Sequence, residues 1–132
     1  RARNAVYCSA GHMPGMLVHD PQTDHGSLEL LSVQSPVIGA MEDMTYANGT
    51  FSFTTGDVLF MYTDGTTEAR SPDGAFFGVE SLRETLLRAV RLDIQRVPEA
   101  VLGEVAVFTQ GNLRDDIAMV AVRFDECPDA RP

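Results

Sequence analysis

The sequence predicts an α+β fold, in which a mostly antiparallel sheet carries two helices on one face. Residues 58–62 are five consecutive apolar side chains bounded by turn-forming residues, a pattern typical of a buried strand. Residues 117–122 form a second, nearly unbroken apolar run. Two later segments, 79–91 and 98–110, repeat apolar residues at helical spacing. We therefore expect the strands 44–53, 57–63 and 117–124 to lie in one sheet beneath both helices.

The first part of the chain predicts a meander of three strands. The candidates are residues 3–10, 16–19 and 27–32. A turn with two glycines and a proline separates the first two strands, and the polar loop 20–26 separates the second from the third.

Residues 44–53 support two local interpretations. Asn48-Gly49 is a strong signal for a tight hairpin turn. Tyr46, Phe51 and Phe53 equally suit one longer strand that is bulged at the glycine. The local pattern alone leaves both possibilities open.

Both helices have recognisable polar faces or boundaries. In the first helix, Glu84 and Arg88 are correctly ordered for an ion pair one turn apart. Pro98 suits the first turn of the second helix, and Gly111 suits its end. Each helix should bury one apolar face against the sheet.

Length and charge narrow the class of protein. The chain has 132 residues, 44% of them hydrophobic, which is enough for one domain with a real core. Its formal net charge of -9 argues against binding to nucleic acid or to an anionic membrane surface. No apolar run is long enough to cross a bilayer, so we expect a cytoplasmic protein.

Cys8 and Cys127 lack metal-type spacing, and we expect free thiols.

Acidic residues stand at one end of each apolar strand. Asp64 directly follows the strand 57–63, whereas Asp115 and Asp116 directly precede the strand 117–124. If these strands are antiparallel neighbours, the three carboxylates meet at one edge of the sheet. Hard cations such as Mg²⁺ and Mn²⁺ prefer carboxylate oxygens, so the sequence predicts a metal-binding edge. Each acidic motif taken singly would more often be a turn or a solvated surface.

Five motifs occur along the chain in a distinctive order and spacing: Ala10-Gly11-His12-Met13-Pro14, the stretch from Gly56 to Gly65 with Tyr62-Thr63-Asp64-Gly65, Thr67-Glu68-Ala69, Phe77-Gly78 and Arg114-Asp115-Asp116-Ile117-Ala118. In this order and spacing they resemble the SpoIIE/RsbU-type serine phosphatases of the PPM superfamily of metal-dependent protein phosphatases. The resemblance covers nearly the whole chain, from about residue 5 to residue 124.

The resemblance implies part of a PPM-type α-β-β-α sandwich with a binuclear Mg²⁺ or Mn²⁺ centre. Asp64 and Asp115 would be metal ligands. The resemblance also favours one continuous strand over 44–53, with Asn48-Gly49 as a bulge.

Family members begin with a further segment, which carries a Gly-Gly-Asp motif whose aspartate bridges the two metals. We therefore expect residues 1–125 to be the C-terminal portion of a catalytic domain and residues 126–132 to be a tail. This portion alone should be inactive and should bind a metal weakly.

Other residues near the motifs are weaker candidates. Gly65, Asp116 and Glu68 could contact metal-bound water or substrate, and His12 could donate a hydrogen bond from its turn. Arg70 and Arg114 could fork onto phosphate oxygens, although they could equally balance the neighbouring acidic residues. His19 and His25 have the setting of surface residues.

Two functions from different classes follow. The resemblance implies a phosphatase acting on phosphoserine or phosphothreonine, with a phosphorylated anti-sigma-factor antagonist of partner-switching stress signalling as its substrate. The alternative is a non-catalytic regulatory or interaction module built on the same fold. Either form would leave part of an apolar sheet face exposed, which could support a homodimer.

Overall fold

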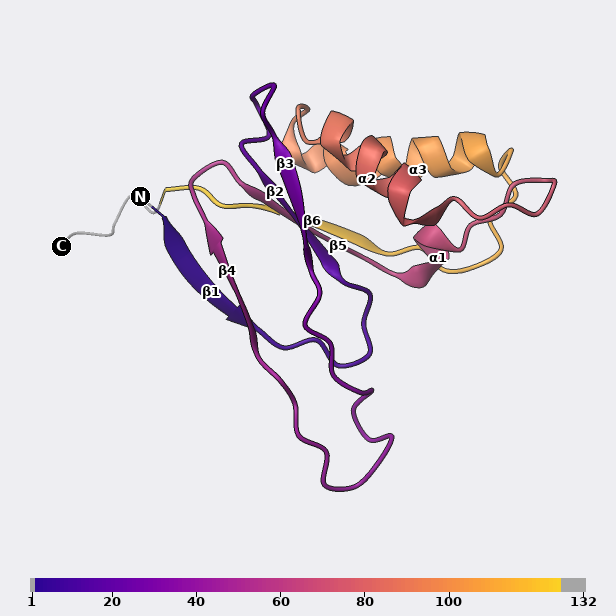
Figure 1. The fold of residues 1–132 in the computed structure, drawn as a ribbon. Coiled ribbons are helices and arrows are strands. Elements are labelled where there is room, and N and C mark those ends of the chain that lie inside the picture. Colours follow the sequence, from indigo (N-terminus) through magenta and orange to yellow (C-terminus); the bar gives the residue numbers. More distant parts are fainter. Residues whose placement is uncertain (1, 127–132) are drawn as a thin grey trace.

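The computed structural model describes residues 2–126 as two sheets and a helical layer (Figure 1). The larger sheet has the order β3-β2-β5-β6, and every neighbouring pair in it is antiparallel. Its strands are β2 (Gly15–His19), β3 (Ser27–Leu31), β5 (Val58–Tyr62) and β6 (Met119–Arg123). The expected α+β class and the expected pairing of the two apolar strands are confirmed.

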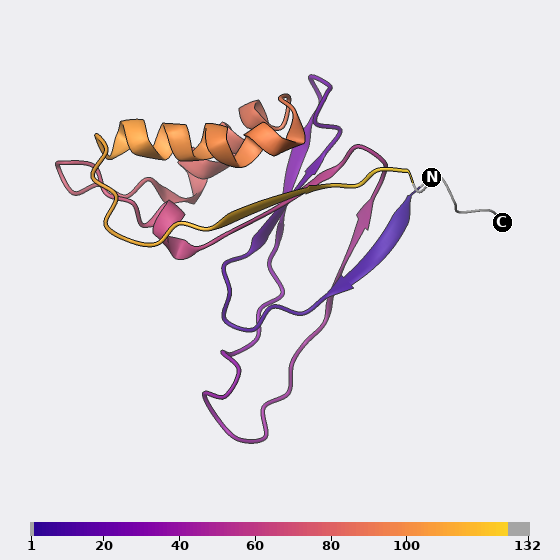
Figure 2. The same cartoon turned by 180° about the vertical axis from the view of Figure 1, so that it is seen from behind.

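The helices lie together on one face of this sheet, as Figure 2 shows from behind. They are α2 (Gly78–Ala89) and α3 (Val97–Phe108), which follows the short 3-10 helix η1 (Ile94–Arg96). Both predicted helices are confirmed to within about two residues. None of the helices in residues 2–126 has the length and apolar character that a bilayer crossing needs.

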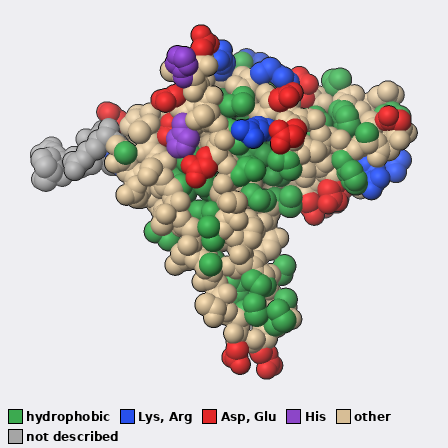
Figure 3. Space-filling model, viewed as in Figure 1, with side chains coloured by type: hydrophobic (Ala, Val, Ile, Leu, Met, Phe, Trp, Pro, Cys, Tyr) green, Lys and Arg blue, Asp and Glu red, His purple; other side chains and the backbone are tan. Residues whose placement is uncertain are grey.

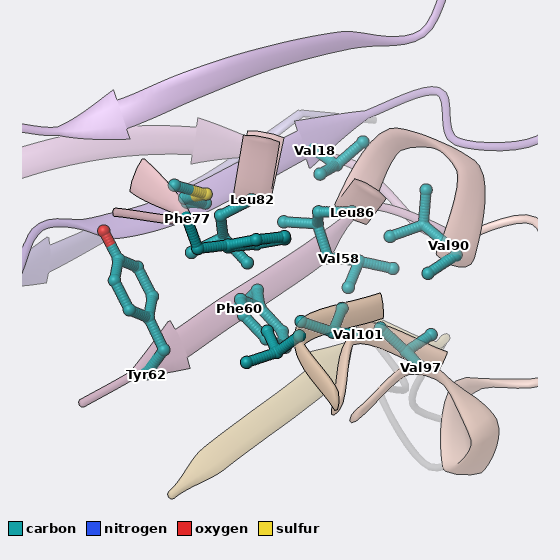
Figure 4. Packing of buried hydrophobic residues seen from close by; sticks show 13 residues of the cluster. Val18, Val58, Phe60, Tyr62, Phe77, Leu82, Leu86, Val90, Val97 and Val101 are labelled. Carbon is teal, nitrogen blue, oxygen red and sulfur yellow. The ribbon is translucent and has the colours of Figure 1, made fainter. Parts of the chain in front are cut away.

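The main core fills the space between the sheet and the helices. Side chains alternate along a strand, so Val58, Phe60 and Tyr62 of β5 all point to the helical side (Figure 4). Leu86 of α2 and Val101 of α3 pack onto them from the other side. These side chains are almost completely buried, as expected for the organising strand.

The opposite face of the sheet is covered only in part. Strands β1 (Arg3–Tyr7) and β4 (Gly49–Phe53) form a separate antiparallel pair that packs against Leu17 and Leu59. Beyond that pair, Met61, Val120 and Val122 remain exposed on the same face. The expectation of an exposed apolar sheet face therefore holds for these residues, whereas Val58 and Phe60 are buried under the helices.

Three predictions about the strands were wrong. Residues 44–48 form no strand, so neither the hairpin nor the continuous strand over 44–53 is found. The part that is a strand, β4, does not lie in one sheet with β5 and β6 as expected, but in a separate sheet with β1. The three-strand meander is not formed either, because β2 pairs with β3 as expected but β1 pairs with β4 and not with β2. The hydroxyl of Tyr7 accepts a hydrogen bond from the amide of Val33 at 3.0 Å, which ties the end of β1 to the segment after β3.

Of the two cysteines, only Cys8 lies within the described residues 2–126. Cys8 is an exposed free thiol at the end of β1, as predicted. Cys127 and the rest of the predicted tail from residue 127 lie outside the described residues.

Candidate metal centre

The two predicted acidic motifs do meet at one edge of the larger sheet. Tyr62, the last residue of β5, is paired with Met119, the first residue of β6. Asp64 follows β5 and begins the one-turn helix α1 (Asp64–Thr67), whereas Asp116 lies in the loop before β6. The antiparallel register therefore brings the end of one motif beside the start of the other.

Thr63 ties these two segments together. Its amide donates to the carbonyl oxygen of Ala118 at 3.0 Å, and its hydroxyl accepts from the amide of Ala118 at 3.0 Å. The same hydroxyl donates to the carbonyl oxygen of Asp116 at 3.1 Å. Sequence reasoning gave Thr63 no role. Its place between β5 and Asp64 was the only signal available.

Gly65 allows the acidic loop to approach closely. A β-carbon added at Gly65 would lie 2.5 Å from the carbonyl oxygen of Asp116 and 3.4 Å from the β-carbon of Asp115. A side chain at residue 65 would therefore displace the loop. The structure brings the candidates Gly65, Asp115 and Asp116 together.

The carboxylates of Asp64 and Asp115 are exposed, and each accepts a hydrogen bond from the amide of the next residue. An oxygen of Asp64 accepts from the amide of Gly65 at 2.9 Å, and an oxygen of Asp115 accepts from the amide of Asp116 at 2.8 Å. Each carboxylate keeps further lone pairs that face solvent.

Carboxylate oxygens are the type of ligand that a hard divalent cation prefers. The described residues supply too few of them at one point to hold such a cation. Within residues 2–126, the structure places no group of three or more His, Cys, Asp or Glu side chains that could hold a metal ion. The expected three-carboxylate cluster is therefore corrected to an edge with separate carboxylates, and the ligand roles of Asp64 and Asp115 stay predictions.

A cavity of about 240 Å³ opens beside this edge. Gly65 and Asp115 border it on the side of the predicted metal ligands. The candidate residue Glu68 and the arginines Arg70 and Arg114 also line it. Residues far apart in sequence thus form one depression at the metal edge.

His12 lies elsewhere. It borders a different cavity of about 200 Å³, which also contacts Tyr7 and Phe51. Its Nδ1 atom is 2.9 Å from the carbonyl oxygen of Met13. The structure therefore does not bring His12 to the cavity that Gly65 and Asp115 border.

A buried carboxylate–histidine pair was missed by the sequence analysis. Asp57, at the start of β5, is only 2% exposed and accepts hydrogen bonds from the amides of Thr54 and Asp20. Nδ1 of His19 lies 3.0 Å from Oδ2 of Asp57, and Nε2 of His19 lies 3.4 Å from Glu29. His19 is therefore not the plain surface residue we expected. The sequence did not reveal the pair because its two partners, His19 and Asp57, are 38 positions apart.

The contacts within this pair shift the pKa values of both side chains. Burial alone would lower the pKa of His19, but hydrogen bonds and negative charge from Asp57 and Glu29 together raise it above its ordinary value of 6.5. Burial alone would raise the pKa of Asp57. The bonds from Thr54, His19 and Asp20 outweigh it and lower that pKa below 3.8.

Comparisons with known proteins agree with the geometry. Residues 1–125 match the family model described as Stage II sporulation protein E (SpoIIE). Protein IcfG of Synechocystis sp. is 33% identical over 125 aligned positions, and the alignment covers 90% of this chain and 18% of IcfG. The phosphoserine phosphatase RsbU of Bacillus subtilis is 24% identical over 118 residues, which are 89% of this chain and 34% of RsbU.

The structural comparison concerns the fold alone. The SiaA-PP2C domain of Pseudomonas aeruginosa superimposes with a TM-score of 0.71 at 22% identity, covering 93% of this chain and 47% of that one. The antiparallel sheets and helical layer are therefore those of a PP2C-type phosphatase domain. The chain belongs to the SpoIIE family, as the motifs predicted. It spans about a fifth to a third of the length of the two relatives compared above.

Proposed function

We propose that this chain is the C-terminal portion of the catalytic domain of a metal-dependent protein serine/threonine phosphatase. The observation that carries the proposal is the junction at Thr63 and Gly65, which holds Asp64 beside Asp115 and Asp116. Membership of a family that includes the phosphoserine phosphatase RsbU supports the reaction class.

In this proposal Asp64 and Asp115 each supply a carboxylate oxygen to a Mg²⁺ or Mn²⁺ centre. When bound, such ions lower the pKa of a coordinated water and stabilise the charge that develops during phosphate ester hydrolysis. The remaining ligands, including a bridging carboxylate, would come from another segment of the same domain. Thr63 and Gly65 act through position, because they fix the distance between the two acidic motifs.

The proposed substrate is a phosphorylated anti-sigma-factor antagonist of a partner-switching stress pathway. The support for it is the family and the similarity to RsbU. The solvent-facing position of Asp64 and Asp115 suits a protein-borne phosphoserine, which must reach the metals from outside.

The test is Mn²⁺-dependent hydrolysis of a phosphoserine protein by the complete phosphatase domain. Asp64→Asn and Asp115→Asn should each lower kcat about 100-fold or more, because each removes a charged ligand. Asp24→Asn is the matched control, since Asp24 is almost fully exposed and pairs with Arg91. Retained activity in Asp64→Asn would contradict the proposal. A wild-type domain without any turnover would favour the non-catalytic module.

A further inference from the structure

The cavity beside the metal edge has a chemical character of its own. Arg70 and Arg114 line the cavity together with the acidic residues Glu68 and Asp115, of which Asp115 is the predicted metal ligand. Leu113 and Ile117 give part of its wall an apolar surface. A ligand held at the metal edge would therefore extend towards two guanidinium groups.

Neither guanidinium is engaged by an acidic partner. Within residues 2–126, no carboxylate oxygen lies within 4.0 Å of Arg70 or Arg114, although Arg114 directly precedes Asp115 and Asp116. Other exposed arginines do have such partners, for example Arg91 with Asp24 at 3.4 Å. Among the described residues, no direct ion pair with a neighbouring acid therefore holds either arginine at the cavity.

Exposed apolar side chains lie in the wall of the cavity and next to Arg70. The guanidinium carbon of Arg70 lies 4.1 Å from the centre of the Phe76 ring, so a cation–π contact orients this cation. Phe76 is 51% exposed and Leu113 is 42% exposed. Apolar side chains beside oriented positive charge are typical of protein-binding surfaces, in which arginine and aromatic residues are enriched.

The charge of the whole chain makes local cations important. With a net charge of -9, the protein repels an acidic ligand at long range. Figure 3 shows one face of the molecule, in the same view as Figure 1. The basic side chains visible on it lie over the helical half, among acidic ones. An acidic polypeptide therefore needs unpaired positive groups at the point of contact, where screening by salt is weakest.

We propose that this cavity binds the substrate chain next to the phosphoserine, and that Arg70 and Arg114 select substrates with acidic side chains flanking it. The inference rests on the proposed phosphatase function and adds a sequence preference to it. Arg can form two parallel hydrogen bonds with one carboxylate, so each arginine can recognise an Asp or Glu side chain.

The test compares two phosphoserine peptides on the complete phosphatase domain with Mn²⁺. One peptide has Asp or Glu on both sides of the phosphoserine, and the other has Ser or Gln there. The quantity measured is the ratio of kcat/KM for the acidic peptide to that for the neutral peptide. In the wild type this ratio should be well above one and should fall as salt is added.

Arg70→Gln and Arg114→Gln should each lower the ratio about three- to tenfold, as expected for the loss of a charge-assisted contact. Arg114→Glu should reverse the preference in favour of Lys-flanked peptides. Arg96→Gln is the control, because Arg96 is exposed in η1 and does not line the cavity. It should leave the ratio unchanged.

The outcomes separate this inference from the proposed function. A wild-type domain that hydrolyses neither peptide would overturn the phosphatase proposal itself. Activity on both peptides, with a ratio that is the same in the wild type and in the Arg70 and Arg114 variants, would overturn only the sequence preference. An equal fall on both peptides would show that the arginines contact the phosphate, and that too would overturn the preference.

Discussion

The carbonyl oxygen of Asp116 stands 2.5 Å from the point that a β-carbon on Gly65 would occupy. The position of that β-carbon is fixed by the backbone of residue 65 and the oxygen belongs to the backbone of Asp116, so no side-chain rotation can relieve the contact. The position directly after Asp64 therefore requires glycine, because a larger residue would clash with the backbone of Asp116. The glycine lets the loop that carries Asp115 and Asp116 rest against the start of α1 (Asp64–Thr67).

Gly65→Ala should lower the free energy of unfolding by about 1–3 kcal/mol, as overpacking does. Urea unfolding of the complete domain measures this change. Gly103→Ala is the matched control, because Gly103 lies in α3 with no atom within 4 Å of its added β-carbon. That substitution should stabilise the helix by about 0.5–1 kcal/mol. Equal stability of the two variants would contradict the close approach at Gly65.

The pair formed by His19 and Asp57 should make stability depend on pH. His19 has a raised pKa in the folded state, so its contribution is complete below its unfolded value of 6.5 and is lost as pH rises through the folded value. Asp57 has a lowered pKa, so its contribution is complete above 3.8 and is lost as pH falls through the folded value. The pair should stabilise the fold most between about pH 4 and 6.5.

His19→Gln should therefore be more destabilising at pH 5 than at pH 8. The measurement is the free energy of urea unfolding at both pH values for wild type and variant. His25→Gln is the control, because the side chain of His25 is exposed. If the difference between wild type and His19→Gln were the same at both pH values, the charged pair would not contribute.

Two tyrosines differ in whether their hydroxyl group has a partner. The Tyr62 hydroxyl is buried and has no hydrogen-bond partner within residues 2–126, and burial raises the pKa of Tyr62. The Tyr7 hydroxyl accepts a hydrogen bond from the amide of Val33. An unsatisfied buried hydroxyl is costly, whereas a satisfied one contributes to stability.

Tyr62→Phe should leave the melting temperature unchanged or raise it, and Tyr7→Phe should lower stability by about 1 kcal/mol. Thermal unfolding of both variants in the complete domain gives the comparison. A loss in Tyr62→Phe as large as that in Tyr7→Phe would show that another segment of the domain supplies a partner for the Tyr62 hydroxyl.

The sequence predicted the parts of the fold that local patterns encode. The runs 58–62 and 117–122 are apolar enough to identify neighbouring core strands, and the helical periodicity after residue 78 identifies α2 and α3. Their pairing then placed Asp64 near Asp115. These elements carry most of the apolar side chains of the main core.

Contacts between distant segments could not be predicted in the same way. Strand β4 pairs with β1, almost fifty residues earlier, and no local pattern of either strand specifies its partner. The pair of His19 and Asp57 likewise depends on the β2–β5 register. The irregular path of residues 44–48 escaped prediction because apolar spacing and a turn signal there suited two other structures.

The last prediction concerns metal binding by the 132-residue chain itself. Asp64 and Asp115 lie at the same sheet edge, but residues 2–126 place no group of three or more potential ligands around one point. A hard cation held by two carboxylates must fill its remaining coordination positions with water. Its affinity should then be weak, with a dissociation constant on the order of a millimolar.

Calorimetric titration of Mn²⁺ into this chain should therefore show at most one weakly bound ion. Asp64→Asn and Asp115→Asn should each abolish that binding, because one remaining carboxylate cannot compete with hydration. Asp24→Asn should leave it unchanged, since Asp24 lies in the loop before β3 and pairs with Arg91. Tight binding of two ions per chain would contradict the prediction, because it would require a bridging ligand from within these 132 residues.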